Sequence, residues 1–252
     1  MLALNVVVCV KRVPETGARI ALTADGRAID DSFLGHTISP HEECAVEEAL
    51  RLAAAHSGST TVVTLGPPAA ADQLRNALAL GIDEAVLLET DGSDWDPQAT
   101  ARALADALRG RAFDLILCGN ESADAGGYQV GVRVAYLLGL PVVTGAKKLE
   151  LDGGSARVWR EAGGGREIFE TPLPAVVTVR EGINLPRYPS LPGRLRAKKA
   201  PIETSAPERV AGGLETVRLS LPQEEGAPVV VLGEGAAAAP RVVEVLRELG
   251  VA

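Results

Sequence analysis

Aromatic residues are scarce in this chain of 252 residues, at 3% of the total. The core must therefore be built from small aliphatic side chains packed in regular layers. Hydrophobic residues make up 46% and charged residues 23% of the chain, a composition that excludes disorder over most of its length. The length fits one large α/β domain, or one such domain with a smaller lobe.

Cysteine and histidine are also rare, with three of each. Cys9, Cys44 and Cys118 lack C-x-x-C spacing, and no histidine pair has metal-ligand spacing, so no metal site is predicted. Cys9 and Cys118 lie within apolar runs and are predicted to be small buried residues in a reducing compartment. No catalytic constellation of side chains stands out.

Long apolar runs and a targeting segment are missing too. No run approaches the roughly 18 residues of a membrane span, and apolar residues precede Lys11 and Arg12, the reverse of a secretory signal. We therefore expect a soluble, cytoplasmic protein without membrane insertion. The 25 basic and 33 acidic residues give a net charge of −8, which argues against nucleic acid as a partner.

Short apolar runs alternate with helical patterns over the first 145 residues. The first helix is predicted to begin at Pro40, and three more to end at Gly81, Gly110 and Gly139. The predicted strands, each covered on both faces, are residues 5–10, 61–65, 85–89, 113–118 and 141–144. This alternation predicts an α/β fold with a doubly wound, Rossmann-like parallel sheet.

The acidic side chains of the first helix follow its N-terminus, where they complement the helix dipole. They are predicted to form a solvated face. The set comprises Glu42, Glu43, Glu47 and Glu48.

The pattern changes after residue 146. Four short runs separated by glycine-rich turns predict antiparallel hairpins appended to the sheet, over residues 147–152, 157–161, 166–171 and 175–179. Residues 182–201 contain four prolines and almost no periodicity, which predicts a long binding loop and not a helix. The main domain is assigned to residues 1–201.

Residues 202–252 are predicted to form a linker and a C-terminal arm. The arm has a strand-like run at 229–232 and an amphipathic helix at 240–249. It either packs on a partner subunit or folds back on its own domain. A G-x-G-x-x-A match at Gly233, Gly235 and Ala238 is interpreted as accidental, because too few residues follow to complete a βαβ unit.

A doubly wound sheet predicts a ligand crevice at the carboxyl ends of its strands. Cys9, the stretch 39–42, Leu65 and the loop 119–131 meet there. The loop is rich in glycine and opens a helix, so its N–H groups are suited to a phosphate, although an ordinary βα turn has the same pattern. No P-loop motif is present. His41 is interpreted as either a helix cap or a contact at the ligand's edge.

A second feature is the basic stretch 187–199, which concentrates five cations in an acidic protein. It is either a solvated loop stiffened by proline, or an extended docking arm with Leu191 as an apolar anchor and basic residues that steer acidic partners. The five cations are Arg187, Arg194, Arg196, Lys198 and Lys199.

Six sequence motifs occur together in a recognisable order along nearly the whole chain. They are residues 10–13 (VKRV), 45–52 (AVEEALRL), 77–81 (ALALG), 173–178 (LPAVVT), 187–192 (RYPSLP) and 196–199 (RAKK). In these motifs the chain resembles the beta subunits of electron transfer flavoproteins.

The resemblance implies a carrier without a catalytic site of its own. Family members pair with an alpha subunit that holds most of the FAD, accept electrons from flavin dehydrogenases such as the acyl-CoA dehydrogenases, and pass them to a membrane quinone oxidoreductase. The beta subunit binds AMP as a structural nucleotide. The implied AMP contacts are Cys9, Ser39, Pro40, His41, Glu42, Leu65, Gly119, Asn120, Glu121, Ser122, Ala123, Asp124, Ala125, Gly126, Gly127, Tyr128, Gln129 and Val130.

The resemblance also implies two contact regions. Leu191 matches the anchor of the family's recognition loop, and the docking set includes Arg187, Tyr188 and Pro192. Arg160 and Glu161 match a pair that lies near the flavin domain of the alpha subunit. Thr16 stands where some relatives place an aromatic residue against the flavin.

A rival interpretation from the same crevice is an adenine-nucleotide hydrolase or sensor. Its weakness is that the sequence has neither a phosphate-cleaving motif nor metal-binding carboxylates beside the glycine-rich loop.

Overall fold

The computed structural model describes residues 3–15, 17–210, 213–222 and 229–251. Thr16 lies outside the described residues. The chain separates into two compact units, Met1–Arg218 and Leu219–Ala252, which are considered individually below.

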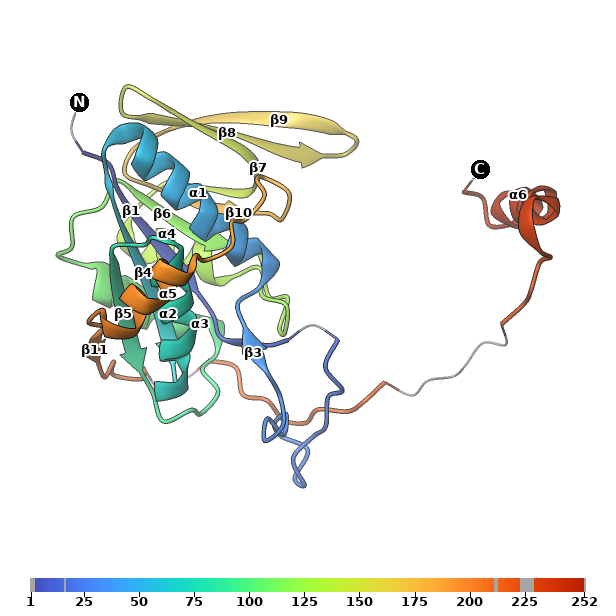
Figure 1. Cartoon of the computed structure of the whole chain (residues 1–252), viewed down its shortest axis with the longest axis horizontal. Coiled ribbons are helices and arrows are strands. Elements are labelled where there is room, and N and C mark those ends of the chain that lie inside the picture. The colour runs from blue at the N-terminus through green and yellow to red at the C-terminus, as the bar shows by residue number, and fades with distance from the viewer. Residues whose placement is uncertain (1–2, 16, 211–212, 223–228, 252) are drawn as a thin grey trace. The chain divides into compact units, whose positions relative to one another are not determined.

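The first unit is built on a sheet of nine strands among the described residues, in the order β11-β5-β4-β1-β6-β10-β7-β8-β9 (Figure 1). The strands are β1 (Asn5–Val10), β4 (Ser59–Gly66), β5 (Glu84–Glu89), β6 (Leu115–Gly119), β7 (Val142–Asp152), β8 (Ser155–Ala162), β9 (Gly165–Pro172), β10 (Ala175–Val179) and β11 (Glu203–Ser205). The predicted α/β class is confirmed, with a mainly parallel sheet and antiparallel strands at one edge.

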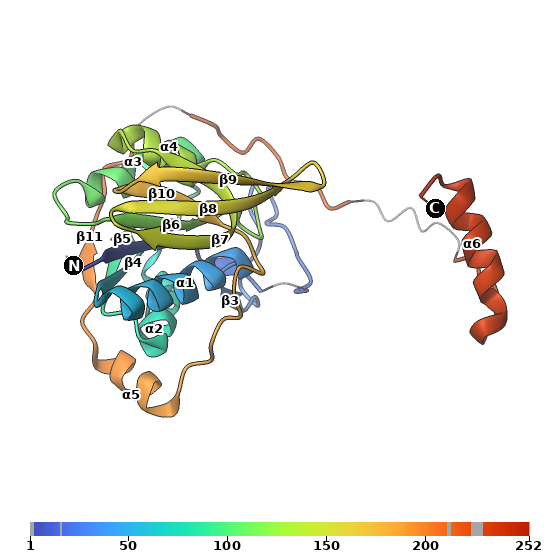
Figure 2. The same cartoon turned by 90° about the horizontal axis from the view of Figure 1, so that it is seen from above.

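Helices cover both faces of the parallel part of the sheet (Figure 2). They are α1 (Pro40–His56), α2 (Ala71–Leu80), α3 (Pro97–Leu108) and α4 (Val130–Leu138). Successive residues of β1 alternate between the faces: Val6 and Val8 pack with α1 and α2, whereas Val7 and Cys9 pack with α3 and α4. Two small-residue cores therefore lie on either side of one sheet, as the lack of aromatics predicts.

The order of the strands reverses at β1. The chain runs outward from β1 to β4 and β5, then returns to place β6 on the other side of β1. The loops after β1 and β6 therefore begin side by side at the carboxyl ends of these strands, the place where doubly wound proteins bind ligands.

The antiparallel prediction for residues 175–179 is wrong. This run is β10, which lies between β6 and β7 and pairs in parallel with both. The chain makes the β7–β8–β9 hairpins first and then returns to the middle of the sheet. The apolar residues of β10 are all buried, as expected for an internal strand, but a short apolar run does not encode its partner strands.

The prediction that residues 182–201 contain no helix is also wrong, because α5 (Leu191–Lys199) lies within this stretch. The Ser190 hydroxyl accepts a hydrogen bond from the Gly193 N–H at 3.1 Å and caps the helix. Pro192 lies in the first turn, where the missing N–H group costs no intrahelical bond. The prolines precede and open the helix without interrupting it.

The predicted solvated acidic face of α1 is wrong for three of its four residues. Glu43 is exposed, but Glu42, Glu47 and Glu48 are buried. Backbone and side-chain donors from Lys11 and from the segment before α5 cover these three carboxyl groups. Donors this distant in the sequence cannot be inferred from the residue pattern of the helix.

The first unit extends past residue 201. Strand β11 pairs with β5, and Arg209 donates to the Ser93 hydroxyl and the Asp94 carbonyl. A small antiparallel pair, β2 (Val13–Pro14) and β3 (His36–Thr37), precedes α1. The sequence patterns predicted neither feature.

The second unit contains a short 3₁₀ turn, η2 (Gly235–Ala238), and helix α6 (Ala239–Glu248). The helix is confirmed, but the strand-like run 229–232 forms no strand in the structure. No residue of the described part of this unit is buried within it. No helix in the described part of the chain is long and apolar enough to span a bilayer.

Candidate nucleotide site

The start of α1 and the loop after β6 are joined across the crevice by one serine. The Ser39 hydroxyl accepts a hydrogen bond from the Ala123 N–H at 3.0 Å, and the Ser39 N–H donates to the Glu42 carboxyl at 3.1 Å. Ser39 is buried. The Ser39 side chain therefore joins two of the segments that were predicted to meet, the start of α1 and the loop after β6.

Glu42 lies buried in the first turn of α1. Its carboxyl group accepts N–H groups from Lys11 and Ser39, each at 3.1 Å. Burial raises the pKa of Glu42 to about 8, so this side chain is mostly protonated at neutral pH. A neutral Glu42 removes a negative charge that would oppose a phosphate. Gly119 approaches it so closely that a Cβ atom there would lie 2.6 Å from the Glu42 Cγ.

An ion pair joins the end of β1 to the same loop. The Lys11 ammonium lies 2.6 Å from the Asp124 carboxylate. Burial opposes ionisation of Asp124, but the hydrogen bond and charge of Lys11 outweigh it and lower the pKa of that carboxyl group. Asp124 is thus an anion whose charge is already balanced within the protein.

His41 follows at the first turn of α1. Its Nε2 atom lies 3.8 Å from the Glu121 carboxylate, while its Nδ1 atom is buried without a hydrogen-bond partner in the described part of the protein. Burial lowers the pKa of His41, which favours the neutral ring. An unpartnered nitrogen on a neutral imidazole is suited to a hydrogen bond with a polar ligand.

Cys9 and Leu65 contribute through their positions at strand ends. Cys9 of β1 lies in register with Cys118 of β6, and both thiols are free and buried, as predicted. Leu65 packs against the same core cluster. Because the Cys9 side chain points into the core, its main chain is the part available to the crevice.

Several loop side chains are engaged inside the protein. The Asn120 amide oxygen accepts the Thr178 hydroxyl at 2.7 Å, and the Gln129 amide oxygen accepts two bonds from Arg133, at 2.9 and 3.1 Å. The first N–H groups of α4, which begins at Val130, have no intrahelical acceptor and carry the positive end of the helix dipole. Main-chain donors are therefore better placed than these side chains to hold an anion.

The remaining predicted contacts belong to the same two segments. Pro40 opens α1 and Val130 opens α4. Gly126 and Tyr128 both have a φ of +55°, so the loop turns sharply through left-handed backbone before α4. Between Asn120 and this turn lie Glu121, Ser122, Ala123, Asp124 and Ala125, and Gly127 lies between the two left-handed positions.

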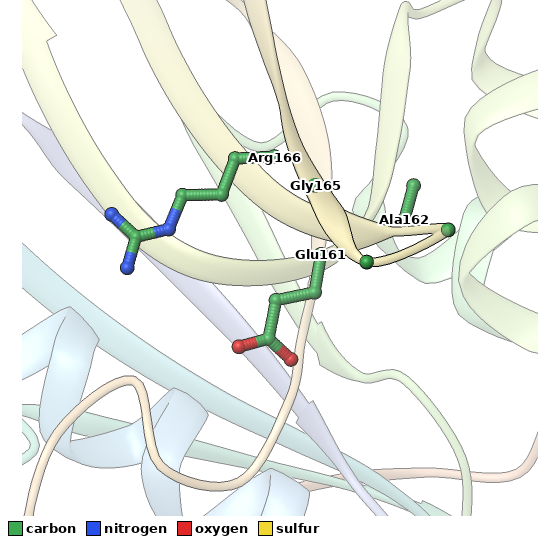
Figure 3. Close-up of a pocket in the computed structure, with 6 residues that line it drawn as sticks. Glu161, Ala162, Gly165 and Arg166 are labelled. Atoms are coloured by element: carbon green, nitrogen blue, oxygen red, sulfur yellow. The ribbon is translucent and has the colours of Figure 1, made fainter.

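A second, open groove of about 520 Å³ lies beside this loop, between it and β7–β8. Arg160 and Glu161 of β8 line it, together with Asn120, Tyr128 and Arg180. Glu161 also lines a neighbouring hollow at the β8–β9 turn, with Arg166 (Figure 3). The two residues predicted to contact a flavin domain thus share a groove with the glycine-rich loop after β6.

The predicted docking residues differ in exposure. Tyr188 is 94% and Leu191 72% exposed, and Pro192 follows Leu191 in the first turn of α5. The Arg187 side chain is 47% exposed, but its guanidinium is bound to the buried Glu47, with its Nε atom 2.7 Å from the carboxylate.

Lys11 and Thr178 contact the candidate site but were absent from the sequence prediction. Lys11 directly follows β1, a position that the strand prediction marks as the edge of the crevice. Thr178 also accepts the Gly145 N–H at 3.0 Å, but its place beside the loop depends on the parallel pairing of β10. No group of three or more His, Cys, Asp or Glu in the described part is arranged to hold a metal ion.

Comparison with known proteins decides the family. Residues 28–209 match the model of the electron transfer flavoprotein domain. The chain belongs to the beta subunits of electron transfer flavoproteins. It is 38% identical to the electron transfer flavoprotein subunit beta of Bacillus subtilis over 97% of this chain and 98% of that protein.

Two further relatives have the same description. The Syntrophomonas wolfei protein is 38% identical over 96% of this chain and 95% of its own length, and the Mycobacterium bovis protein is 40% identical over 77% and 76%. The resemblance found in the sequence is confirmed, and with it the assignment to electron carriers. The hydrolase half of the rival prediction, which was an adenine-nucleotide hydrolase or sensor, is wrong.

Proposed function

We propose that this chain pairs with an alpha subunit holding most of the FAD, and that the heterodimer carries electrons from flavin dehydrogenases, such as acyl-CoA dehydrogenases, to a membrane quinone oxidoreductase. A flavin held at a subunit junction transfers electrons by proximity, so the beta chain needs no acid, base or metal for this role. The relatives' shared description as subunit beta supports a partner subunit.

AMP is the proposed structural ligand of the crevice. Three features support it: the unpartnered Nδ1 atom of His41, the raised pKa of the buried Glu42, and the first-turn N–H groups of α4. The main chain at Cys9 and Leu65 completes the crevice wall. The nucleotide acts here by filling space and satisfying polar groups, without a redox step.

Two other surfaces have proposed partners. The groove at Arg160 and Glu161 faces the flavin domain of the alpha subunit, and α5 docks the dehydrogenase through Leu191. The residues from 202 onward include the C-terminal arm, which we assign to contact with the alpha subunit, since its own unit buries none of its described residues.

Leu191 carries the docking assignment, because it and Tyr188, three residues earlier, are 72% and 94% exposed, and neighbouring exposed apolar side chains mark interaction surfaces. Leu191→Ala in the heterodimer is expected to slow reduction by an acyl-CoA dehydrogenase without loss of AMP or FAD. Leu214, also 72% exposed, provides the matched control: Leu214→Ala should leave the rate unchanged.

The measurement is the rate of flavin reduction with increasing dehydrogenase, together with nucleotide analysis of the heat-denatured heterodimer. An unchanged rate for Leu191→Ala removes the docking role from this residue. Absence of AMP from the denatured protein removes the proposed ligand, and stoichiometric FAD on the chain purified alone contradicts the division between the subunits.

A further inference from the structure

The segment between β10 and α5 is fastened along helix α1 before it reaches the exposed docking residues. The Asn184 side-chain amide donates to the Cys44 carbonyl and to the Glu48 carboxyl group, both at 2.9 Å. The Cys44 thiol lies 3.8 Å from the Asn184 carbonyl. One end of the segment is therefore fixed to the side of α1.

Glu47 makes the next attachment, three residues further along. Its carboxylate accepts the Arg187 Nε at 2.7 Å, Nη2 on the same edge of the guanidinium at 3.0 Å, and the Arg187 main-chain N–H at 3.2 Å. The Glu47 side chain is only 5% exposed. This bidentate pair with an added main-chain bond fixes both the side chain and the backbone of Arg187.

Helix α5, which follows this segment, is seated against α2 near both of its ends. A Cβ atom at Gly193 would lie 2.3 Å from the Ala79 carbonyl oxygen, so the helices approach closely there. Arg75 of α2 donates to the Ala197 carbonyl at 2.7 Å, near the C-terminus of α5. The exposed Tyr188 and Leu191 thus lie between two fixed points.

We propose that Glu47 is a positioning residue for dehydrogenase docking, and that Arg187 serves docking through its pair with Glu47 and not by contact with the dehydrogenase. This inference rests on the proposed function. Before the dehydrogenase binds, the pair already holds the segment around Tyr188 and Leu191 in the conformation used for docking. Less conformational freedom is then lost on association.

A direct steering role for Arg187 and a positioning role for the pair predict opposite effects of losing Glu47 on dehydrogenase docking. If the guanidinium attracted an acidic partner directly, Glu47→Gln would free that charge, and docking would stay the same or tighten. If the pair positions the segment, Glu47→Gln and Arg187→Gln must weaken docking alike, and the double variant must be no worse than either single variant.

The experiment uses the heterodimer with its flavin, reduced by a purified acyl-CoA dehydrogenase. Glu47→Gln and Arg187→Gln are each expected to raise KM about tenfold with kcat unchanged, which corresponds to the freedom of about one long side chain regained in the free protein. Glu43→Gln, on the exposed side of the same helix, is the control and should leave KM unchanged. AMP and FAD contents confirm that each variant folds.

Amide hydrogen exchange of residues 184–190 supplies the second readout. Exchange should rise in Glu47→Gln and Arg187→Gln and stay at the wild-type level in Glu43→Gln. An unchanged KM or unchanged exchange in Glu47→Gln overturns the inference, as does a KM increase in the double variant that equals the product of the single increases. A wild-type heterodimer that no acyl-CoA dehydrogenase reduces overturns the proposed function itself.

Discussion

Replacement of Glu42 by glutamine should change how stability depends on pH. Folding raises the pKa of this carboxyl group from its ordinary value of 4.5 to about 8, because burial penalises the charged form. Between these two values the folded state binds the proton and the unfolded state releases it. The free energy of unfolding therefore falls as pH rises from 4.5 to 8.

The size of the effect follows from the two pKa values. They differ by about 3.5, and each pKa unit corresponds to about 1.36 kcal/mol. Wild type should lose about 5 kcal/mol relative to Glu42→Gln across this range, with the full difference present above pH 8. Below pH 4.5 glutamine and the protonated acid are both neutral, so this pH-dependent difference between the proteins vanishes.

The assay is denaturant unfolding of nucleotide-free wild type and Glu42→Gln at a fixed protein concentration, from pH 4.5 to 9. The stability curves should diverge as pH rises. A wild-type infrared band of a protonated carboxylic acid, absent from the variant at pH 7, provides an independent check. Parallel stability curves would refute the assignment of a protonated, buried Glu42.

Two further changes test the packing around the crevice and the docking helix. Thr178→Val leaves the Asn120 amide oxygen and the Gly145 N–H without their partner, so unfolding should become easier by about 1–3 kcal/mol and AMP release faster; equal AMP release rates in wild type and variant would contradict the link to the loop. Gly193→Ala forces a methyl group toward the Ala79 carbonyl and should destabilise the protein by about 1–3 kcal/mol, with weaker dehydrogenase docking at unchanged AMP content; an unchanged melting temperature would show that α5 is not seated as described.

The predicted layers followed from local patterns in the sequence. Apolar runs marked the strands of the parallel core, and residues such as Pro40 and Gly139 marked helix ends, because these signals act within a few residues. The same logic brought the α1 start and the loop after β6 to one crevice, since parallel strands carry their loops at a common edge.

Contacts between distant segments could not be predicted in this way. The position of β10 depends on which strands accept it, and the burial of Glu47 depends on Arg187, 140 residues later. The four prolines of residues 182–201 favoured a loop over helix α5, although Ser190 and Pro192 together form a helix-start signal. The position of β10 and the burial of Glu47 depend on tertiary partners. The start of α5 is a local signal, and the neighbouring prolines outweighed it.

The attachment of the segment 184–190 to α1 has a consequence for chimeras made between related beta subunits. The segment 184–190 of this chain, transplanted into another beta subunit, brings Arg187 but not the carboxylate that holds it. Unless the recipient helix supplies a glutamate at the position of Glu47, the graft leaves the anchoring leucine in a loosely held chain. In chimeric subunits, the choice of partner should therefore be transferred only when α1 and the segment 184–190 are exchanged together.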